Sequence, residues 1–363
     1  MNDQLDRALG AYYGLALGDA LGMPTQVMSR EDVVRVYGTV TGFEPALPDN
    51  PVSAGMPAGS VTDDTDQAVI VGKLIDEGRG RIDPLRLAHE LLAWEKEMKA
   101  KGSFDLLGPS TKAALDAVAR GVPAAEAGRY GSTNGAAMRV TPVGIAFAAE
   151  PLPDFLDRVV ESCQVTHDTT VGIAGAAAVA AAVSTGVGGG TLDAAVAAAV
   201  TAARAGARRG HWIAGADIAA RIEWAWQLVE GLPQAEALDR ICTLVGTSVA
   251  SQESVPAAFA VLAVAGGDPW RSTLLAASLG GDSDTIGAIA GAVAGSVAGL
   301  SALPAEAVRT LRTVNALELE PLTARLLGLR ASGTPGTSAA PAPATGTGHG
   351  TATATGSAYS PAG

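Results

Sequence analysis

Residues 83–98 read DPLRLAHELLAWEKEM and carry the pattern that decides the fold class. Asp83 and Pro84 are typical of the N-cap and the first position of a helix. The apolar residues that follow are spaced by four, three and four positions: Leu87, Leu91, Trp94 and Met98. Because this spacing places them on one side of a 3.6-residue turn, the segment is predicted to be an amphipathic helix.

The same helical period recurs further along the chain, whereas period-two strand signals are scarce. It appears at Ile218, Ile222, Ala225 and Val229, and again at Val308, Leu311 and Val314. The many Ala and Gly residues indicate helices that approach one another closely. We therefore predict an all-α fold, a compact orthogonal array of many helices.

Composition favours one globular domain with a tail. The chain has 363 residues, of which 48% are hydrophobic and 17% charged. Residues 331–363 contain no Asp, Glu, Lys or Arg and are expected to be disordered, which leaves residues 1–330 as one compact domain. The net charge of −12 argues against a broad surface for nucleic acid or anionic membrane, so neither partner is expected.

Two long uncharged stretches, residues 170–191 and 285–303, raise the question of membrane spans. Both are mostly Ala and Gly and lack flanking aromatic or basic residues, so we interpret them as buried helices. The first residues show no secretory signal. Cys163 and Cys242 are predicted to be a buried, reduced pair, and the protein is expected to be cytoplasmic.

Two acidic clusters precede apolar runs, GSVTDDTD at residues 59–66 and GGDSDT at residues 280–285. Each alone could be an ordinary helix start, since carboxylates suit the positive end of the helix dipole. If the clusters meet, their oxygen atoms would suit Mg²⁺, Mn²⁺ or Ca²⁺, with two ions about 4 Å apart. A calcium EF-hand is excluded because Val293 takes the place of its bidentate Glu. The candidate metal ligands are Thr62, Asp63, Asp64, Asp282, Asp284 and Thr285.

Three further segments have both a structural and a functional interpretation. The loop GSTNGAAMR at residues 131–139 is either a turn before a helix or a backbone cradle for a phosphate or ribose. His167 is expected to open the following Ala-rich helix, as a cap, a core residue or a ligand contact. Residues 14–22, which include Asp19, indicate close glycine-mediated helix packing.

Taken together, five blocks at residues 18–22, 62–65, 134–139, 166–167 and 280–285 resemble the signatures of the ADP-ribosylglycohydrolase family. The resemblance spans residues 8–320 and implies an all-α fold with a binuclear Mg²⁺ centre, Mn²⁺ being possible. It implies hydrolysis at C1 of a ribose, most simply release of ADP-ribose from a protein or small-molecule ADP-ribosyl conjugate. It also implies substrate contacts by Asn134, Gly135, Met138, His167, Gly281 and Ser283.

The chain departs from the family pattern at Gln26, where members that act on ADP-ribosylated proteins commonly carry Glu. An amide has no ionisable proton and cannot act as a general base. Asp63 or Asp64 would then assist the attacking water, with Gln26 as the third candidate catalytic-site residue. The substitution keeps two alternatives open: a nucleoside or nucleotide N-ribohydrolase, and a module that binds ADP-ribose without cleaving it.

Overall fold

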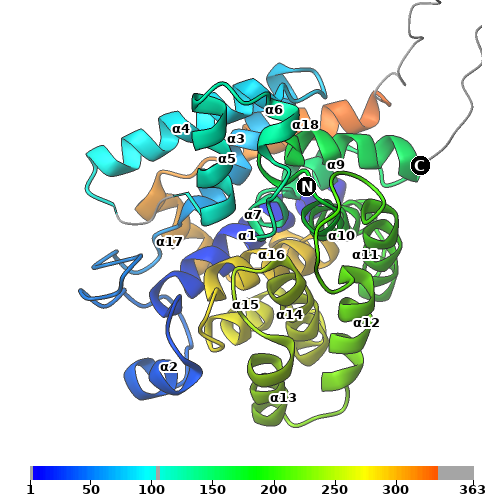
Figure 1. Ribbon diagram of the computed structural model, residues 1–363. Helices are drawn as coiled ribbons and strands as arrows, with labels where there is room; N and C mark the ends of the chain where they lie inside the picture. Colours follow the sequence, from blue (N-terminus) through cyan, green and yellow to red (C-terminus); the bar gives the residue numbers. More distant parts are fainter. Residues whose placement is uncertain (1–2, 104–106, 334–363) are drawn as a thin grey trace, which may run out of the picture.

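The computed structural model describes residues 3–103 and 107–333, and these residues form an all-α fold, as predicted (Figure 1). Within the described residues there is no β-ladder, only isolated bridges between Thr133 and Ala250 and between Thr169 and His211. In chain order the helical elements are α1 (Asp3–Gly22), η1 (Met23–Thr25), α2 (Arg30–Tyr37), α3 (Asp63–Glu77), α4 (Pro84–Ala100), α5 (Pro109–Ala119), α6 (Ala124–Ala127), α7 (Gly135–Met138), α8 (Thr141–Ala146), α9 (Leu152–His167), α10 (Thr170–Val187), α11 (Leu192–Gly206), α12 (Ile218–Val229), α13 (Gln234–Arg240), η2 (Ile241–Val245), α14 (Ser251–Ala265), α15 (Pro269–Ala277), α16 (Ser283–Ala298), η3 (Leu300–Ala302), α17 (Ala305–Asn315) and α18 (Glu320–Ala331).

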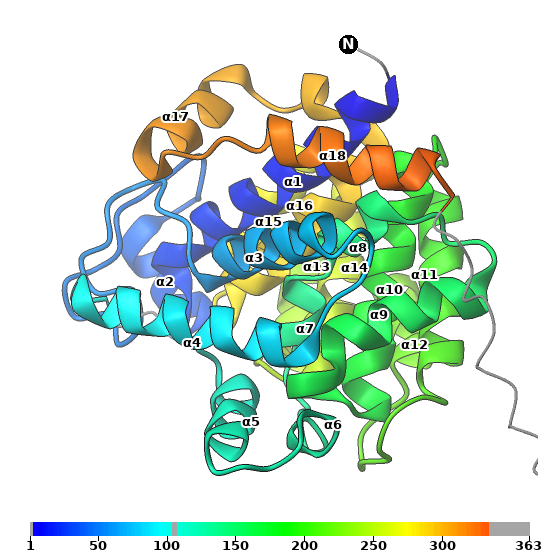
Figure 2. The same ribbon diagram turned by 90° about the horizontal axis from the view of Figure 1, so that it is seen from above.

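Helices α1 and α16 lie side by side at the centre of the molecule (Figures 1 and 2). Glycines of α1 face glycines of α16 so closely that a methyl group on Gly18 would overlap the carbonyl group of Gly287. The same holds for Gly14 against Gly291. The two backbones are therefore in direct contact, as the small residues of both segments predicted.

Helix α4 begins at Pro84, as the sequence predicted. Asp83 caps α4 by accepting hydrogen bonds from the backbone N–H groups of Leu85 and Arg86, and Leu87 and Leu91 are fully buried. The prediction for the short apolar stripe of α17 was wrong at its end, because the side chain of Val314 is 42% exposed. Val314 lies in the last turn of α17, beyond the part that packs on the core.

Helix α10 is the one described helix that is long and apolar enough to cross a membrane, but 89% of its 18-residue apolar window is buried inside the fold. The first fourteen residues of α16 are likewise buried. Both segments therefore serve as core helices in this fold, as the sequence predicted.

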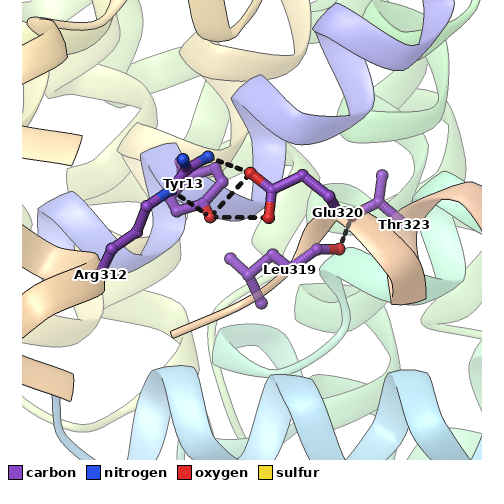
Figure 3. Close-up of polar contacts among 5 residues, drawn as sticks. All are labelled: Tyr13, Arg312, Leu319, Glu320 and Thr323. Atoms are coloured by element: carbon purple, nitrogen blue, oxygen red, sulfur yellow. Dashed lines mark hydrogen bonds and ion pairs between the residues drawn. The ribbon is translucent and has the colours of Figure 1, made fainter. Parts of the chain in front are cut away.

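The last two helices are attached to α1 by a polar cluster that Figure 3 shows. Arg312 of α17 donates a hydrogen bond from Nε to the hydroxyl oxygen of Tyr13 at 2.9 Å, and the Tyr13 hydroxyl donates to Glu320 of α18 at 3.1 Å. Arg312 also forms an ion pair with Glu320. In α18, the Thr323 hydroxyl donates to the carbonyl of Leu319 at 2.7 Å. This cluster fixes the end of the described chain against its beginning.

The structure differs in part from the predictions for the two cysteines and for the start of the tail. Cys163 is buried, but Cys242 is only half-buried in the short helical segment η2, where its Sγ contacts the carbonyl of Leu279. The expected tail begins at Ala331, which ends α18, and residues 334–363 lie outside the described part of the chain.

Candidate metal centre and ligand cavity

The N-terminal ends of α3 and α16 meet at a cavity of about 280 Å³. Asp63 and Asp64 line it from α3, and Asp282, Asp284 and Thr285 line it from α16. The Thr285 hydroxyl donates a hydrogen bond to Oδ2 of Asp64 at 3.2 Å. The two acidic clusters, more than two hundred residues apart in the sequence, therefore form one site.

Asp19 of α1 holds the start of α3 in place. Its fully buried carboxylate accepts hydrogen bonds from the backbone N–H and the hydroxyl of Thr62, at 3.0 and 2.7 Å. It also accepts hydrogen bonds from the N–H and hydroxyl of Thr65. Burial raises the pKa of Asp19 to about 6, although these four donors favour its charged form. The sequence had indicated only close packing here, and the role of Asp19 in positioning Thr62 was missed.

The carboxylates of the cavity lie in surroundings that disfavour their charged forms. Burial raises the pKa of Asp64 well above its ordinary value, and Asp284 and Asp63 raise it further. Burial also raises the pKa of Asp282 to about 6, against hydrogen bonds from Asn134 and Thr285 that lower it. Among the described residues, no ion pair includes Asp64 or Asp282, and Oδ1 of Asp64 is buried without a hydrogen-bond partner.

The acidic cluster offers carboxylate and hydroxyl oxygen atoms as ligands for a divalent cation. As the side chains stand, no three Asp, Glu, His or Cys residues of the described chain form a ready-made metal cluster. The unpartnered buried Oδ1 of Asp64 and the neighbouring Asp284 and Thr285 nevertheless supply the hard oxygen atoms that Mg²⁺ and Mn²⁺ prefer. The residues fit such a cation, because a positive charge would offset the repulsion that raises the pKa of Asp64.

Several other predicted site residues also line the cavity, namely Gln26, Asn134, Gly135 and Met138. Gln26 is 6% exposed, and its Nε2 has no hydrogen-bond partner in the described structure. Asn134 donates from Nδ2 to Asp282 and, at 2.9 Å, to the hydroxyl oxygen of Ser254. The Asn134 loop therefore contacts the acidic cluster directly.

Four predicted residues do not lie on the cavity wall. Thr62 is buried behind it with its hydroxyl on Asp19. Ser283 is buried and donates to the carbonyl of Gly22 at 3.0 Å, so its side chain points toward α1. Gly281 packs against Thr247, and its carbonyl accepts a hydrogen bond from the N–H of Val27 at 2.6 Å.

His167 is the fourth, and it ends α9 rather than opening α10, whose N-cap is Thr169. Its ring is fully buried because the last turn of α9 packs behind the loop at residues 131–134. The ring packs beneath Gly135 and is joined to the cavity wall by Thr133, whose Oγ1 lies 3.0 Å from its Nε2. Thr133 lies within a block that the sequence had singled out, but its hydroxyl was overlooked.

Comparisons with known proteins identify the family of the chain. A sequence model of the family ADP-ribosylglycohydrolase matches residues 1–335. The chain is 35% identical to the uncharacterized protein YegU of Escherichia coli over 86% of its own length and 94% of that protein. It is 28% identical to the ADP-ribosyl-[dinitrogen reductase] glycohydrolase of Rhodospirillum rubrum, over 45% of this chain and 52% of that protein.

A solved structure gives the same result. The fold is similar to an ADP-ribosylglycohydrolase-related protein complex with a TM-score of 0.64 and 26% identity, covering 91% of this chain and 99% of the other. Members of the matched family are glycosyl hydrolases. The chain therefore belongs to the ADP-ribosylglycohydrolase family and is a hydrolase with its all-α fold.

Proposed function

We propose that this protein hydrolyses the glycosidic bond at C1 of the ribose in an ADP-ribosyl conjugate and that it requires Mg²⁺. The observation that carries the proposal is the meeting of Asp64 with Asp284 and Thr285 at one cavity, with a buried carboxylate oxygen that has no protein partner. Family membership supports the reaction class, and the donor chemistry supports the metal.

The position of each residue on the cavity wall suggests its role in the reaction. Asp64, Asp282, Asp284 and Thr285 line the cavity and would hold two divalent cations, Mg²⁺ or Mn²⁺, whereas the predicted ligand Thr62 lies behind the wall with its hydroxyl on Asp19. When bound, such cations supply positive charge and activate water as a nucleophile. Asp63 lies at the first position of α3 on the cavity wall and would accept a proton from the attacking water. Gln26 would donate a hydrogen bond from its unpartnered Nε2 to the ligand. Its amide has no ionisable proton, so it would not act as an acid or base.

One observation favours a second candidate, an N-ribohydrolase that acts on nucleosides or nucleotides. The described residues of the cavity wall include no Lys, Arg or His. A diphosphate would therefore find no cationic side chain there, whereas an uncharged nucleoside requires none.

Turnover assays on the full-length protein test both candidates. ADP-ribosyl-arginine, ADP-ribosyl-serine and free nucleosides are incubated with Mg²⁺ or with a chelator, using Asp64→Asn as the site variant and the exposed Asp193→Asn as its matched control. We expect Mg²⁺-dependent release of free ADP-ribose by the wild type and Asp193→Asn only. Turnover of nucleosides alone would favour the second candidate, and no turnover of any substrate would refute both.

A further inference from the structure

A chain of buried hydrogen bonds runs beneath the cavity and begins at Asp63. Gln67 donates from Nε2 to Oδ2 of Asp63 at 2.6 Å, and its Oε1 accepts from Nη1 of Arg139 at 2.8 Å. A guanidinium group only donates and a carboxylate only accepts, so the orientation of the Gln67 amide is fixed between them. Gln67 and Arg139 are fully buried.

The second branch of Arg139 leads back to the cavity through Thr166. Nη2 of Arg139 donates to Oγ1 of Thr166 at 2.6 Å, and the same Oγ1 lies 2.8 Å from Nδ1 of His167. These two are the only hydrogen bonds of the Thr166 hydroxyl group in the described structure. Its single hydrogen must point to Nδ1 of His167, because otherwise a buried hydroxyl hydrogen would have no acceptor.

This assignment fixes the tautomer of His167. With Nδ1 as acceptor, the proton of the neutral ring is on Nε2, which then donates to Oγ1 of Thr133 at 3.0 Å. Burial holds the pKa of His167 well below its ordinary value, and the charge of Arg139 lowers it further, so the ring is neutral.

The direction of every bond in the chain therefore follows from the one group that can only donate, Arg139. Thr133 uses an oxygen lone pair to accept from His167, and its own hydrogen has no partner among the described residues. Thr133 is only partly buried and lines the cavity.

We propose that this chain of hydrogen bonds fixes Thr133 as a hydrogen-bond donor in the cavity, where it binds an acceptor oxygen of the ligand. A ribose hydroxyl or a phosphoryl oxygen fits this donor, and an ammonium or amide N–H group does not. The direction of the bonds is independent of the proposed function, and only the identity of the ligand rests on it.

The first test needs no ligand. The chain has four histidines, so ¹⁵N labelling of histidine in the full-length protein gives a spectrum that His167→Gln assigns. We expect the His167 ring to carry its proton on Nε2 at neutral pH. Thr166→Val should lose this tautomer preference, whereas Thr166→Ser should keep it. A proton on Nδ1 in the wild type, or an unchanged preference in a folded Thr166→Val, would overturn the proposal.

The second test measures binding of ADP-ribose with Mg²⁺ by calorimetry. Loss of a hydrogen bond should weaken binding by Thr133→Val about 10-fold, while Thr133→Ser stays close to the wild type. Equal affinity of a folded Thr133→Val and the wild type would refute the ligand contact. ADP, which lacks the distal ribose, and adenosine, which also lacks the diphosphate, separate the oxygen sources. A penalty with ADP-ribose alone assigns the distal ribose, a penalty with ADP-ribose and ADP but not adenosine assigns the diphosphate, and a penalty with all three assigns the adenosine ribose. If the wild type binds none of these ligands, the proposed function fails and the first test still decides the direction of the chain.

Discussion

Asp19 accepts both the backbone N–H and the hydroxyl hydrogen of Thr62, so a carboxylate of α1 sets the position at which α3 begins. Asp19→Asn replaces one acceptor oxygen by a donor that faces other donors. We expect the free energy of unfolding to fall by roughly 3 kcal/mol because buried N–H and O–H groups lose their acceptor. Urea unfolding monitored by circular dichroism measures this. The helix cap Asp217→Asn, on the surface at α12, is the matched control and should cost clearly less. Equal losses in the two variants would contradict the role of Asp19.

Removal of one charge from the acidic cluster should preserve the stability of the metal-free protein and abolish its stabilisation by Mg²⁺. Asp64→Asn relieves repulsion from Asp284 and Asp63, so its melting temperature in chelator should equal or exceed that of the wild type. The wild type should gain stability with Mg²⁺, about 2.7 kcal/mol at a concentration of 100 times Kd, and the variant should not. Differential scanning fluorimetry with Asp193→Asn as control measures both effects. A full Mg²⁺ response in Asp64→Asn would speak against a metal at this cluster.

The contact between α1 and α16 should not tolerate a single methyl group. Gly18→Ala forces its Cβ into the backbone at Gly287, and we expect a loss of roughly 3 kcal/mol. Gly42→Ala is the matched control, because nothing lies within 4 Å of a Cβ at that position. Chemical unfolding of both variants checks the prediction, and similar stabilities would mean that the helices can move apart at little cost.

Gln26 offers a test of substrate choice. Gln26→Glu places a carboxylate on the cavity wall, where burial and the neighbouring aspartates would raise its pKa toward that of a useful general base. We expect faster release of ADP-ribose from ADP-ribosyl-arginine than in the wild type, with Gln26→Ala as the control that removes the amide without adding a base. If Gln26→Glu and Gln26→Ala have the same rate, proton transfer at this position is not limiting.

The two cysteines should be poor nucleophiles in the native protein. Burial raises the pKa of Cys163 to about 12 and that of Cys242 to about 11, so little thiolate forms at pH 8. Both folded-state values exceed that of an unfolded thiol, so the unfolded chain loses its thiol protons first and stability should fall as the pH rises above about 9. Alkylation by iodoacetamide at pH 8, followed by mass spectrometry, should label Cys242 slowly and Cys163 only after unfolding. Rapid native labelling of Cys163 would contradict its burial.

The sequence predicted several of the helices, but not the individual side-chain contacts between them. Asp83 and the apolar stripe that begins at Leu87 are local signals, and they placed α4 correctly. Asp64 and Thr285 are each visible as helix-start residues, but their 3.2 Å contact depends on how α3 and α16 pack. The presence of two such clusters suggested that they meet, and the resemblance of the complete motif set to a family supported this.

The sequence could not give the orientation of individual side chains. His167 and Ser283 belong to recognisable blocks, yet both point into the protein because their neighbours there supply hydrogen-bond partners. Val314 continues a helical period past the point where the core ends. A one-dimensional pattern records which residues share a helix face, and it does not record where the opposing surface stops.

The glycine contact between α1 and α16 also determines what can move when the site fills and empties. At the cavity end of this contact a methyl group on Gly22 would overlap the backbone of Asp284, so no side chain lies between the two main chains that could rearrange to let them separate. Because Asp19 of α1 also holds the start of α3, we expect the gap between the two acidic clusters to change little when a ligand binds. We therefore expect a ligand to enter and leave past the loop at Val27, a residue that lines the cavity and is 54% exposed.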